Sequence, residues 1–267
     1  MNVLEAVVLG IVEALTEYVP VSSTGHLILT SHLFGIEDDA FTKAFEIVIQ
    51  GGSILAVILF YWKLLWKHLK NLMSFEAQAV QFYLKLFVAF FPAAFVGLLF
   101  YKKIKHYLFG PLPVVVALVV GGIAMVLIER RFKTSPENDE DKEITMKGAF
   151  VVGLCQILSL WPGTSRAMTT LIGGRLVGLS AYKSAEFSFL LATPIILAAT
   201  AYDLLKIGPD LFQDIEKIKL LLIGTTVSFV VSLFVIKAFL GFLKSHSLEV
   251  FGWYRIALGI LFYYFFL

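Results

Sequence analysis

Two carboxylates, several hydroxyls and a histidine gather near the start of the chain. Glu13 and Glu17 are four residues apart, so on a helix both side chains lie on one face. A carboxylate pair of this kind can bind a divalent cation, with phosphate completing the shell, or it can activate a hydroxyl. The segment that follows, Pro20-Val-Ser-Ser-Thr-Gly-His26, supplies Ser22, Ser23, Thr24 and His26.

This first cluster has structural as well as chemical interpretations. Ser and Thr are favoured at helix N-termini, so the hydroxyls after Pro20 could simply cap a second helix. The same N-terminus, with its free N–H groups, is also an anion-binding site. The two carboxylates could instead belong to an interfacial helix and be solvated. His26 follows Ser23 by three residues and could be a structural residue, or the acid or base of a reaction.

A second polar cluster, Pro162-Gly-Thr-Ser-Arg-Ala-Met-Thr-Thr170, has a similar design with a positive charge. Gly163 allows close approach of the backbone, Ser165 can cap a helix, and Thr170 adds a hydroxyl. Arg166 is costly at membrane depth unless a carboxylate or a phosphate pairs with it. The structural alternative is an ion pair of Arg166 with Glu13 or Glu17. Arg175, nine residues further on, is offset on the helix and is predicted to be an anchor.

Together the clusters predict phosphoryl transfer, a reaction in which positioning and charge neutralisation do most of the work. They offer a hydroxyl nucleophile, carboxylates and a guanidinium for phosphate. A phosphate substrate inside a bilayer suggests a lipid phosphate. The alternative from another class is a transporter or flippase of an anionic lipid, because broken helices in inverted repeats are typical of transporters.

The composition indicates a polytopic membrane protein. Of the 267 residues, 58% are hydrophobic and 16% are charged, whereas a soluble domain is about 45–50% apolar and about 25% charged. The net charge of +2 is too small to indicate a nucleic-acid partner. Cys155 is the single cysteine, so no intramolecular disulfide can form.

Apolar segments of about 20 residues predict membrane-spanning helices. The segments that meet this length are 44–66, 81–101, 112–130, 183–205, 218–243 and 249–267. Regions 1–35 and 146–178 are apolar too, but each is broken by a polar cluster that contains proline. They are predicted to be re-entrant helix hairpins, because irregular backbone at membrane depth must be buried in protein or line a water-filled cavity.

The chain divides into two similar halves around a polar linker at 133–145. Residues 1–132 and 146–267 each contain one hairpin and three spans, and matching pairs recur in the same order. The pairs are Gly10-x-x-Glu13 with Gly153-x-x-Gln156, Lys43-x-x-Glu46 with Lys183-x-x-Glu186, Ser53 with Thr193, and Ala117-Leu118 with Ala257-Leu258. Three is an odd number of spans, so the sequence predicts an all-α inverted repeat whose hairpins meet near the membrane midplane.

Basic residues near the span ends predict the orientation. One side carries Lys63, Lys67, Lys70, Arg130, Arg131, Lys133, Lys142, Lys147 and Lys244, and the other carries Lys102, Lys103, Lys105, Lys206, Lys217 and Lys219. The larger set is expected in the cytoplasm, which places both termini outside.

The motifs of the two clusters together resemble those of a known family. Glu13-x-x-x-Glu17 followed by Pro20-Val-Ser-Ser-Thr-Gly-His26, with Pro162-Gly-x-Ser-Arg166 and Ala185-Glu-Phe-Ser-Phe-Leu-Leu191 in the second half, closely resembles the bacitracin-resistance family, the undecaprenyl-diphosphate phosphatases. The resemblance covers essentially the whole chain. One position departs from the family pattern, which usually has Ser where this chain has Ala167, so no essential hydroxyl can come from there.

The resemblance implies an enzyme of the bacterial plasma membrane that hydrolyses undecaprenyl diphosphate to the monophosphate and inorganic phosphate. This reaction recycles the lipid carrier for cell-wall synthesis and confers resistance to bacitracin. The resemblance also implies a Mg²⁺ or Ca²⁺ requirement and a site that opens toward the periplasm. The family's functional residues fall on Glu13, Glu17, Ser23, His26, Ser165 and Arg166, with Thr24 and Thr170 as lesser members.

The expected mechanism places the lipid tail in a lateral groove and the diphosphate at the hairpin junction. Ser23 attacks with Glu17 as base, Glu13 holds the cation or assists, and Arg166 binds phosphate oxygens. The predicted phosphate site is completed by Ser22, Thr24, Gly163, Ser165 and Thr170. Direct attack by a metal-held water and a base or acid role for His26 remain alternatives, and a homodimer stays open as an assembly.

Overall fold

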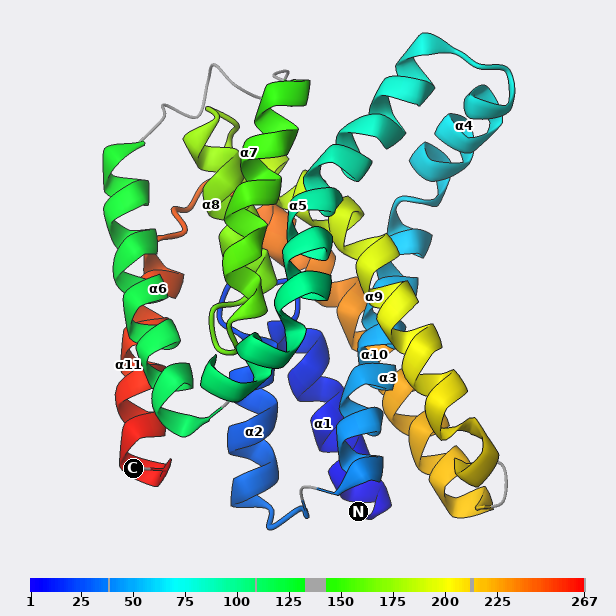
Figure 1. Cartoon of the computed structure of the whole chain (residues 1–267), viewed down its shortest axis with the longest axis vertical. Helices are drawn as coiled ribbons and strands as arrows, with labels where there is room; N and C mark the ends of the chain where they lie inside the picture. Colours follow the sequence, from blue (N-terminus) through cyan, green and yellow to red (C-terminus); the bar gives the residue numbers. More distant parts are fainter. Residues whose placement is uncertain (38, 109, 133–142, 212–213, 267) are drawn as a thin grey trace. The chain divides into compact units, whose positions relative to one another are not determined.

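The computed structural model describes residues 1–37, 39–108, 110–132, 143–211 and 214–266, which are helical and contain no strand. The predicted all-α class is therefore confirmed (Figure 1). In chain order the helices are α1 Val3–Thr16, α2 Ser23–Leu33, α3 Ala40–Phe60, α4 Trp62–Met73, α5 Ala77–Leu108, α6 Pro111–Arg131, α7 Met146–Ile157, the short 3₁₀ helix η1 Leu158–Leu160, α8 Arg166–Leu176, α9 Ala181–Leu211, α10 Ile215–Leu243 and α11 Glu249–Phe266.

Each predicted hairpin region consists of two short helices around a break. In the first region, α1 and α2 are separated by residues 17–22, and in the second, α7 with η1 and α8 are separated by residues 161–165. Helix α1 starts with a capping box, in which the Asn2 side chain accepts from the Glu5 N–H and the Glu5 carboxylate accepts from the Asn2 N–H. Most of the predicted polar linker, residues 133–142, lies outside the described residues.

The first predicted span, 44–66, is wrong at its C-terminal end. Helix α3 stops at Phe60, and residues 62–66 belong to a separate helix, α4. The hydropathy pattern predicted one continuous span across α3 and the start of α4, because Trp62 and Trp66 are apolar. The lysines at 63, 67 and 70 lie between apolar residues, as in an amphipathic helix. None of the residues of α4 is buried, so its apolar side chains do not build a core.

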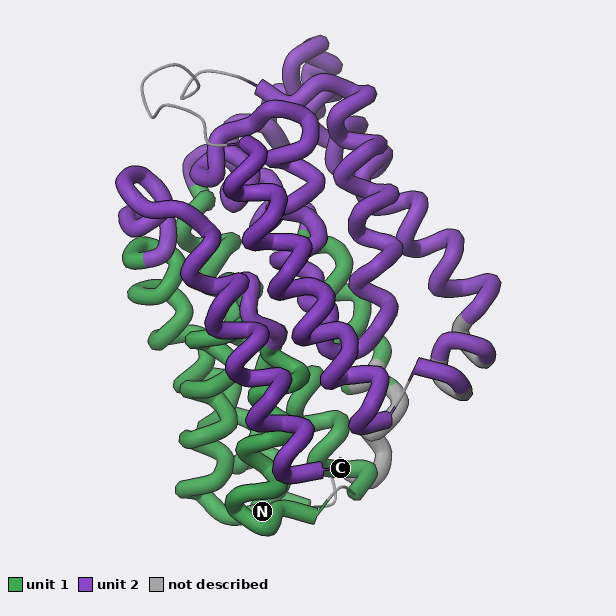
Figure 2. Tube along the Cα trace, turned by 90° about the vertical axis from the view of Figure 1, so that its left-hand side faces the viewer, with its two compact units in different colours: residues 1–18, 23–62, 192–238 green, residues 19–22, 63–191, 239–267 purple. Residues whose placement is uncertain are grey.

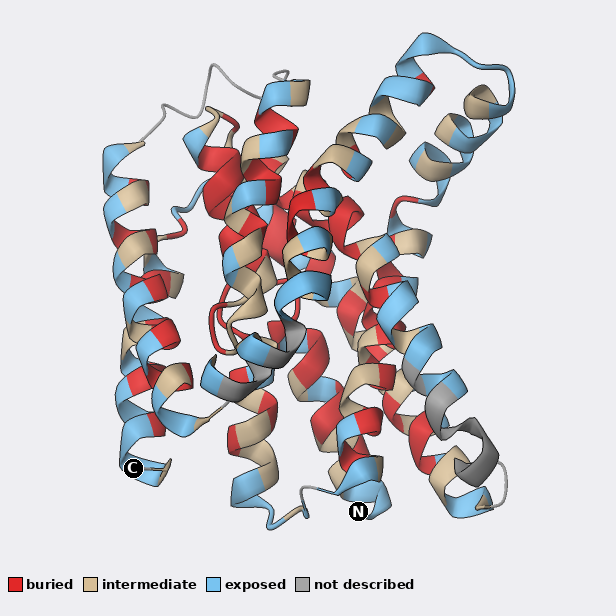
Figure 3. Ribbon diagram, viewed as in Figure 1, coloured by how far each residue is buried: buried red, intermediate tan, exposed pale blue. Residues whose placement is uncertain are grey.

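Five helices among the described residues are long and apolar enough to cross a membrane, so the chain is a multi-pass membrane protein. They are Ala40–Phe60, Ala77–Phe100, Pro111–Arg131, Ala181–Tyr202 and Ile215–Leu243. The predicted sixth span, α11, is helical but is not among these five; its eighteen residues include Glu249 and Arg255. Large apolar side chains are also exposed, such as Phe87, Phe91 and Phe95 of α5. Figure 3 colours the exposed stretches of the helices pale blue. A water-soluble protein rarely exposes such a contiguous apolar surface.

The chain folds into two compact units, and each takes helices from both sequence halves (Figure 2). Unit 1 comprises residues 1–18, 23–62 and 192–238, and unit 2 comprises residues 19–22, 63–191 and 239–267. The core of unit 1 joins α1, α2, α3 and α10. Its buried members are Ala6, Leu9, Leu27, Phe45, Val48, Ile49, Leu220 and Leu221.

Unit 2 is built on two pairs of packed helices. Helix α6 packs along α11, and α5 packs along α7, which in turn contacts α8 (Figure 1). At the α5–α7 contact a Cβ on Gly153 would lie 2.6 Å from the carbonyl oxygen of Ala89, closer than real Cβ atoms approach. Glycine at this position therefore lets the two backbones touch.

The helix order repeats along the chain in a way that fits the predicted repeat. Helix α7 begins 143 residues after α1, and α8 begins 143 residues after α2. The packing is reciprocal as well. Gly10 of α1 approaches Gly224 of α10, where a Cβ would lie 2.7 Å from the carbonyl oxygen, just as Gly153 of α7 approaches α5. Each hairpin thus packs against a long helix of the other half, which fits the predicted repeat. The inversion across the membrane stays a prediction.

Candidate active site

In unit 1, the first break brings a hydroxyl onto a carboxylate. Helix α1 ends at Thr16, and Glu17 is its C-cap, with its N–H bonded to the Glu13 carbonyl at 2.9 Å. Six residues later Ser23 opens α2, and its Oγ donates to Glu17 Oε2 at 2.7 Å. This length is typical of a strong hydrogen bond from a hydroxyl to a charged acceptor. The pair has the arrangement expected of a nucleophile and its base.

Both carboxylates of the motif are buried. Glu13 is fully buried and Glu17 is 8% exposed, so the alternative of solvated glutamates on an interfacial helix does not hold. Among the described residues, no group of three or more His, Cys, Asp or Glu side chains could hold a metal. Mg²⁺ usually takes only one or two carboxylates and completes its shell with water and substrate phosphate. Glu13 and Glu17, one helical turn apart, match the number of carboxylates that such a cation takes from a protein.

The other polar residues of the first motif differ in their surroundings. Thr24 is exposed, and His26 is half-buried in α2 three residues after Ser23. Ser22, which belongs to unit 2, is buried and has a φ of 77°. Few residues other than glycine adopt this left-handed backbone, and such strain is concentrated at functional sites.

In unit 2, the second break has the same backbone feature. Ser165 precedes α8 with a φ of 71°, and its Oγ accepts a hydrogen bond from the Met168 N–H at 3.2 Å, so the predicted cap is present. Gly163 has a φ of 90°, and a Cβ there would lie 2.8 Å from the Val114 carbonyl oxygen. The chain enters α8 by a turn that needs glycine at this position.

Arg166 is the first residue of α8 and is half-buried. Its Nη1 donates to the Ser188 carbonyl of α9 at 3.1 Å. The guanidinium is thereby oriented by a fixed backbone oxygen. A planar fork held in this way is suited to binding the oxygens of a phosphate.

Thr170, predicted as part of the phosphate site, is buried and already has protein partners. Its hydroxyl bonds to the Arg166 carbonyl at 2.9 Å and to Ser188 Oγ at 2.6 Å. Ser188 was not singled out from the sequence, although it is the serine of Ala185-Glu-Phe-Ser-Phe-Leu-Leu191, a segment that supports the family resemblance. Ser188 therefore contacts both Arg166 and Thr170.

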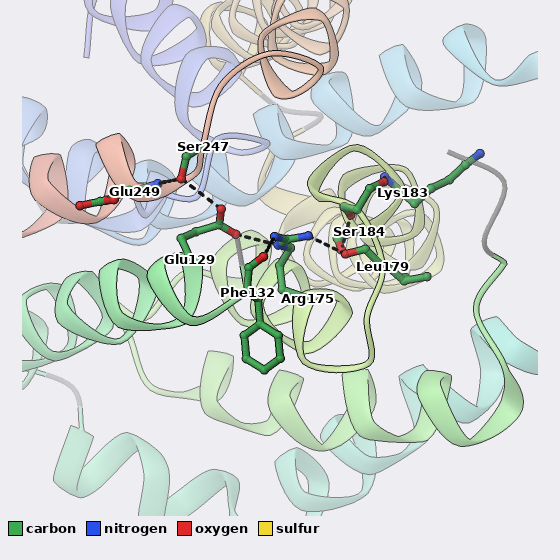
Figure 4. Close-up of polar contacts among 9 residues, drawn as sticks. Glu129, Phe132, Arg175, Leu179, Lys183, Ser184, Ser247 and Glu249 are labelled. Carbon is green, nitrogen blue, oxygen red and sulfur yellow. Dashed lines mark hydrogen bonds and ion pairs between the residues drawn. The ribbon is translucent and has the colours of Figure 1, made fainter. Parts of the chain in front are cut away.

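Arg175 is the predicted anchor, and its partner is a carboxylate on another helix (Figure 4). Its Nε donates to Glu129 Oε1 of α6 at 2.8 Å, and its Nη1 donates to the Leu179 carbonyl at 2.8 Å. Its Nη2 bonds to the Phe132 carbonyl, and Ser247 Oγ donates to the other oxygen of Glu129 at 3.1 Å. With Glu129 and Arg175 buried at its centre, this cluster ties α6 and α8 to the segment before α11.

One further arginine, Arg255 of α11, was not singled out from the sequence. It is fully buried in unit 2 and donates to the carbonyls of Pro20, Ala117 and Gly163. The signal that could have found it is a lone charge inside an apolar helix, which is usually functional.

The fold and these clusters define a class: a multi-pass helical membrane protein whose broken helices carry buried carboxylates, a serine and arginines. The sequence matches the family described as "Bacitracin resistance protein BacA" over residues 6–261. A match of this extent shows that the chain belongs to that family.

Curated relatives are similar in sequence to this protein along nearly the whole chain. A protein of Sorangium cellulosum named undecaprenyl-diphosphatase is 47% identical over 259 residues, covering 96% of this chain and 84% of the relative. One of Aquifex aeolicus with the same name is 44% identical and covers 98% of both chains. One of Nitrosomonas europaea, also so named, is 45% identical and covers 97% of this chain and 92% of the relative.

Proposed function

We propose that this chain hydrolyses undecaprenyl diphosphate to undecaprenyl phosphate and inorganic phosphate. The observation that carries the proposal is the 2.7 Å hydrogen bond from Ser23 Oγ to Glu17 Oε2, a nucleophile–base pair at the start of a helix. The names of the curated relatives supply the substrate. The apolar surface of the helices suits a substrate with a long hydrocarbon tail.

In the proposed step Ser23 Oγ attacks the terminal phosphorus. Glu17 takes the hydroxyl proton as the Oγ–P bond forms, and the P–O bond to the bridging oxygen breaks, so undecaprenyl phosphate leaves with the electron pair. Glu17 then releases its proton to solvent. A water then attacks the phosphoserine and loses a proton to Glu17 as the P–Oγ bond breaks. Glu17 returns that proton to Ser23 Oγ, which frees inorganic phosphate and restores the serine hydroxyl.

Arg166 serves in this proposal as the group that binds phosphate charge. Its orientation by the Ser188 carbonyl supports this role, because aligned cationic donors lower the barrier to phosphoryl transfer. The N–H groups at the start of α8 add donors for an anion. His26, one turn after Ser23, could protonate the leaving oxygen or replace Glu17 as base.

A divalent cation would be held by Glu13 and Glu17. Mg²⁺ or Ca²⁺ there would neutralise charge on the diphosphate as it is cleaved. The spacing of the two residues supports the assignment, because Glu13 lies in α1 and Glu17 is its C-cap one turn later, and Mg²⁺ usually takes one or two carboxylates from a protein.

We place the enzyme in the bacterial plasma membrane with the site open to the periplasm. The larger set of basic residues near the helix ends supports a placement with both termini outside, and the family resemblance is the reason for placing the opening of the site on the periplasmic side. In that position the enzyme would recycle the lipid carrier of cell-wall synthesis and lower the diphosphate available to bacitracin.

The proposal is tested on purified protein in detergent. The wild-type chain should release phosphate from a C55 polyprenyl diphosphate and from a shorter C15 diphosphate. Acid quenching during turnover of a substrate labelled with ³²P on its terminal phosphate should leave label on Ser23. Release without label would favour direct attack by water, and no release at all would contradict the proposed function.

The cation is tested by chelation and by substitution. EDTA should abolish phosphate release, and Mg²⁺ or Ca²⁺ should restore it. Glu13→Gln should raise the cation concentration needed for half-maximal activity, whereas Glu5→Gln on the same helix should not. An unchanged requirement in Glu13→Gln would remove Glu13 from the cation site.

A further inference from the structure

Arg255 is a fully buried charge without a carboxylate partner among the described residues of the protein. Its guanidinium bonds only to backbone carbonyls: Nη1 to Pro20 at 3.3 Å, and Nη2 to Ala117 and to Gly163, each at 3.0 Å. Arg175, the other deeply buried arginine, has the Glu129 carboxylate instead. A buried charge is costly, and the cost is normally offset by an opposite charge. Packing alone is therefore a poor explanation for Arg255.

The carbonyls of Pro20 and Gly163 occupy equivalent places in the two repeats. Pro20 lies three residues before Ser23, the first residue of α2, and Gly163 lies three residues before Arg166, the first residue of α8. In each case the residue directly before the helix is a serine with positive φ, Ser22 or Ser165. The Arg255 guanidinium thus binds the equivalent backbone carbonyl in each of the two breaks.

The Arg255 guanidinium lies directly against Gly121. A Cβ on Gly121 of α6 would lie 2.6 Å from Arg255 Nη2 and 2.9 Å from Met168 Sδ. Glycine at 121 therefore allows the fork to reach both breaks. Lysine could not replace Arg255, because the single ammonium group of lysine cannot donate to carbonyls that lie in the separate directions of Nη1 and Nη2.

We propose that Arg255 is a positioning residue for phosphoryl transfer, an inference that rests on the proposed function. By fixing residues 19–22 and 162–165 it sets the backbone that leads into Ser23 and into Arg166. Phosphoryl transfer depends on positioning, and a displacement of about 1 Å can cost about 10²-fold in rate. Arg255 acts through the two breaks and not on the substrate.

Kinetics of two substitutions test this role. Arg255→Met should lower kcat by about 10²-fold, and Arg255→Lys, which keeps the charge, should still lose about tenfold, with KM changed less than about threefold in both. Arg175→Lys is the matched control: it should lower the thermal midpoint but keep kcat and KM of the folded enzyme. Normal kcat in folded Arg255→Lys and Arg255→Met would overturn the proposal.

A second measurement does not depend on activity. In a Cys155→Ala background, the pair Val19→Cys and Pro162→Cys should be joined readily by a short bismaleimide, because both flank the carbonyls that Arg255 holds. Adding Arg255→Met, or Gly121→Ala if the former does not fold, should slow this cross-linking, whereas Arg175→Lys should not. Unchanged cross-linking would overturn the positioning role. Slower cross-linking in a chain that releases no phosphate would uphold the clamp and contradict only the proposed function.

Discussion

Ser23 and Glu17 form a hydrogen bond across the first helix break, with 2.7 Å between the serine Oγ and the carboxylate Oε2. Glu17 ends one helix and Ser23 begins the next, so the break itself creates the contact. A regular helix would not place residues six apart on the same side in this way. The irregular backbone is therefore what brings these two side chains into contact.

Removing either member of this pair should stop most of the reaction. Ser23→Ala and Glu17→Gln are each expected to lower kcat by about 10²-fold or more, the scale of losing one aligned group. The double variant should be no worse than the poorer single one, because the two residues act as a unit. Ser31→Ala, in the same helix, is the control and should stay within about twofold of wild type. Additive losses in the double variant would show that the two side chains act separately.

Arg166→Lys should lower kcat/KM by about tenfold to 10²-fold, because lysine keeps the charge but loses the planar fork and the bond to the Ser188 carbonyl. Arg130→Lys is the matched control. Arg130 is exposed and paired with Glu249 in the same unit, so its replacement should have little effect. Steady-state kinetics on a polyprenyl diphosphate measure both, and equal behaviour of the two variants would rule out a special role for Arg166.

The Glu129–Arg175 pair should matter for stability and not for catalysis (Figure 4). Arg175→Met leaves a buried carboxylate without its cation, which typically costs about 3–5 kcal/mol. Adding Glu129→Leu removes that carboxylate and should recover part of the loss. Thermal unfolding in detergent measures the three proteins. A double variant less stable than Arg175→Met would contradict the interpretation.

The stability that the N-cap of α3 contributes to the fold should depend on pH. The backbone N–H of Thr42 holds the pKa of Asp39, the N-cap of this helix, below its usual 3.8. A lowered carboxyl pKa means that the cap stabilises the fold above pH 3.8 and loses this effect as the pH falls through the folded value. The thermal midpoint of wild type should therefore exceed that of Asp39→Ala at neutral pH, and the difference should shrink at acidic pH. A constant difference would show that the carboxylate charge has no part in the cap.

The first helix break and the positions of its polar residues could be predicted because they depend on neighbouring residues in the sequence. The four-residue spacing of Glu13 and Glu17 places both on one face of any helix, and proline with a run of small hydroxyl residues ends one helix and opens another. The apolar segments similarly predicted most of the long helices. The error at α3 and α4 arose because hydropathy cannot tell a continuous span from a span followed by an amphipathic helix.

The long-range partners of the buried arginines could not be predicted from the sequence. Nothing near Arg175 indicates that its partner is Glu129, forty-six residues earlier. Nothing near Arg255 indicates that its fork reaches Pro20 and Gly163, because those bonds depend on how α6 and α11 pack against the breaks. The sequence by itself determined the membrane class, the broken helices and the types of polar group that they carry. Only the tertiary structure decided which arginine anchors a carboxylate and which one holds both breaks, because hydrogen bonds of a buried charge are set by three-dimensional packing.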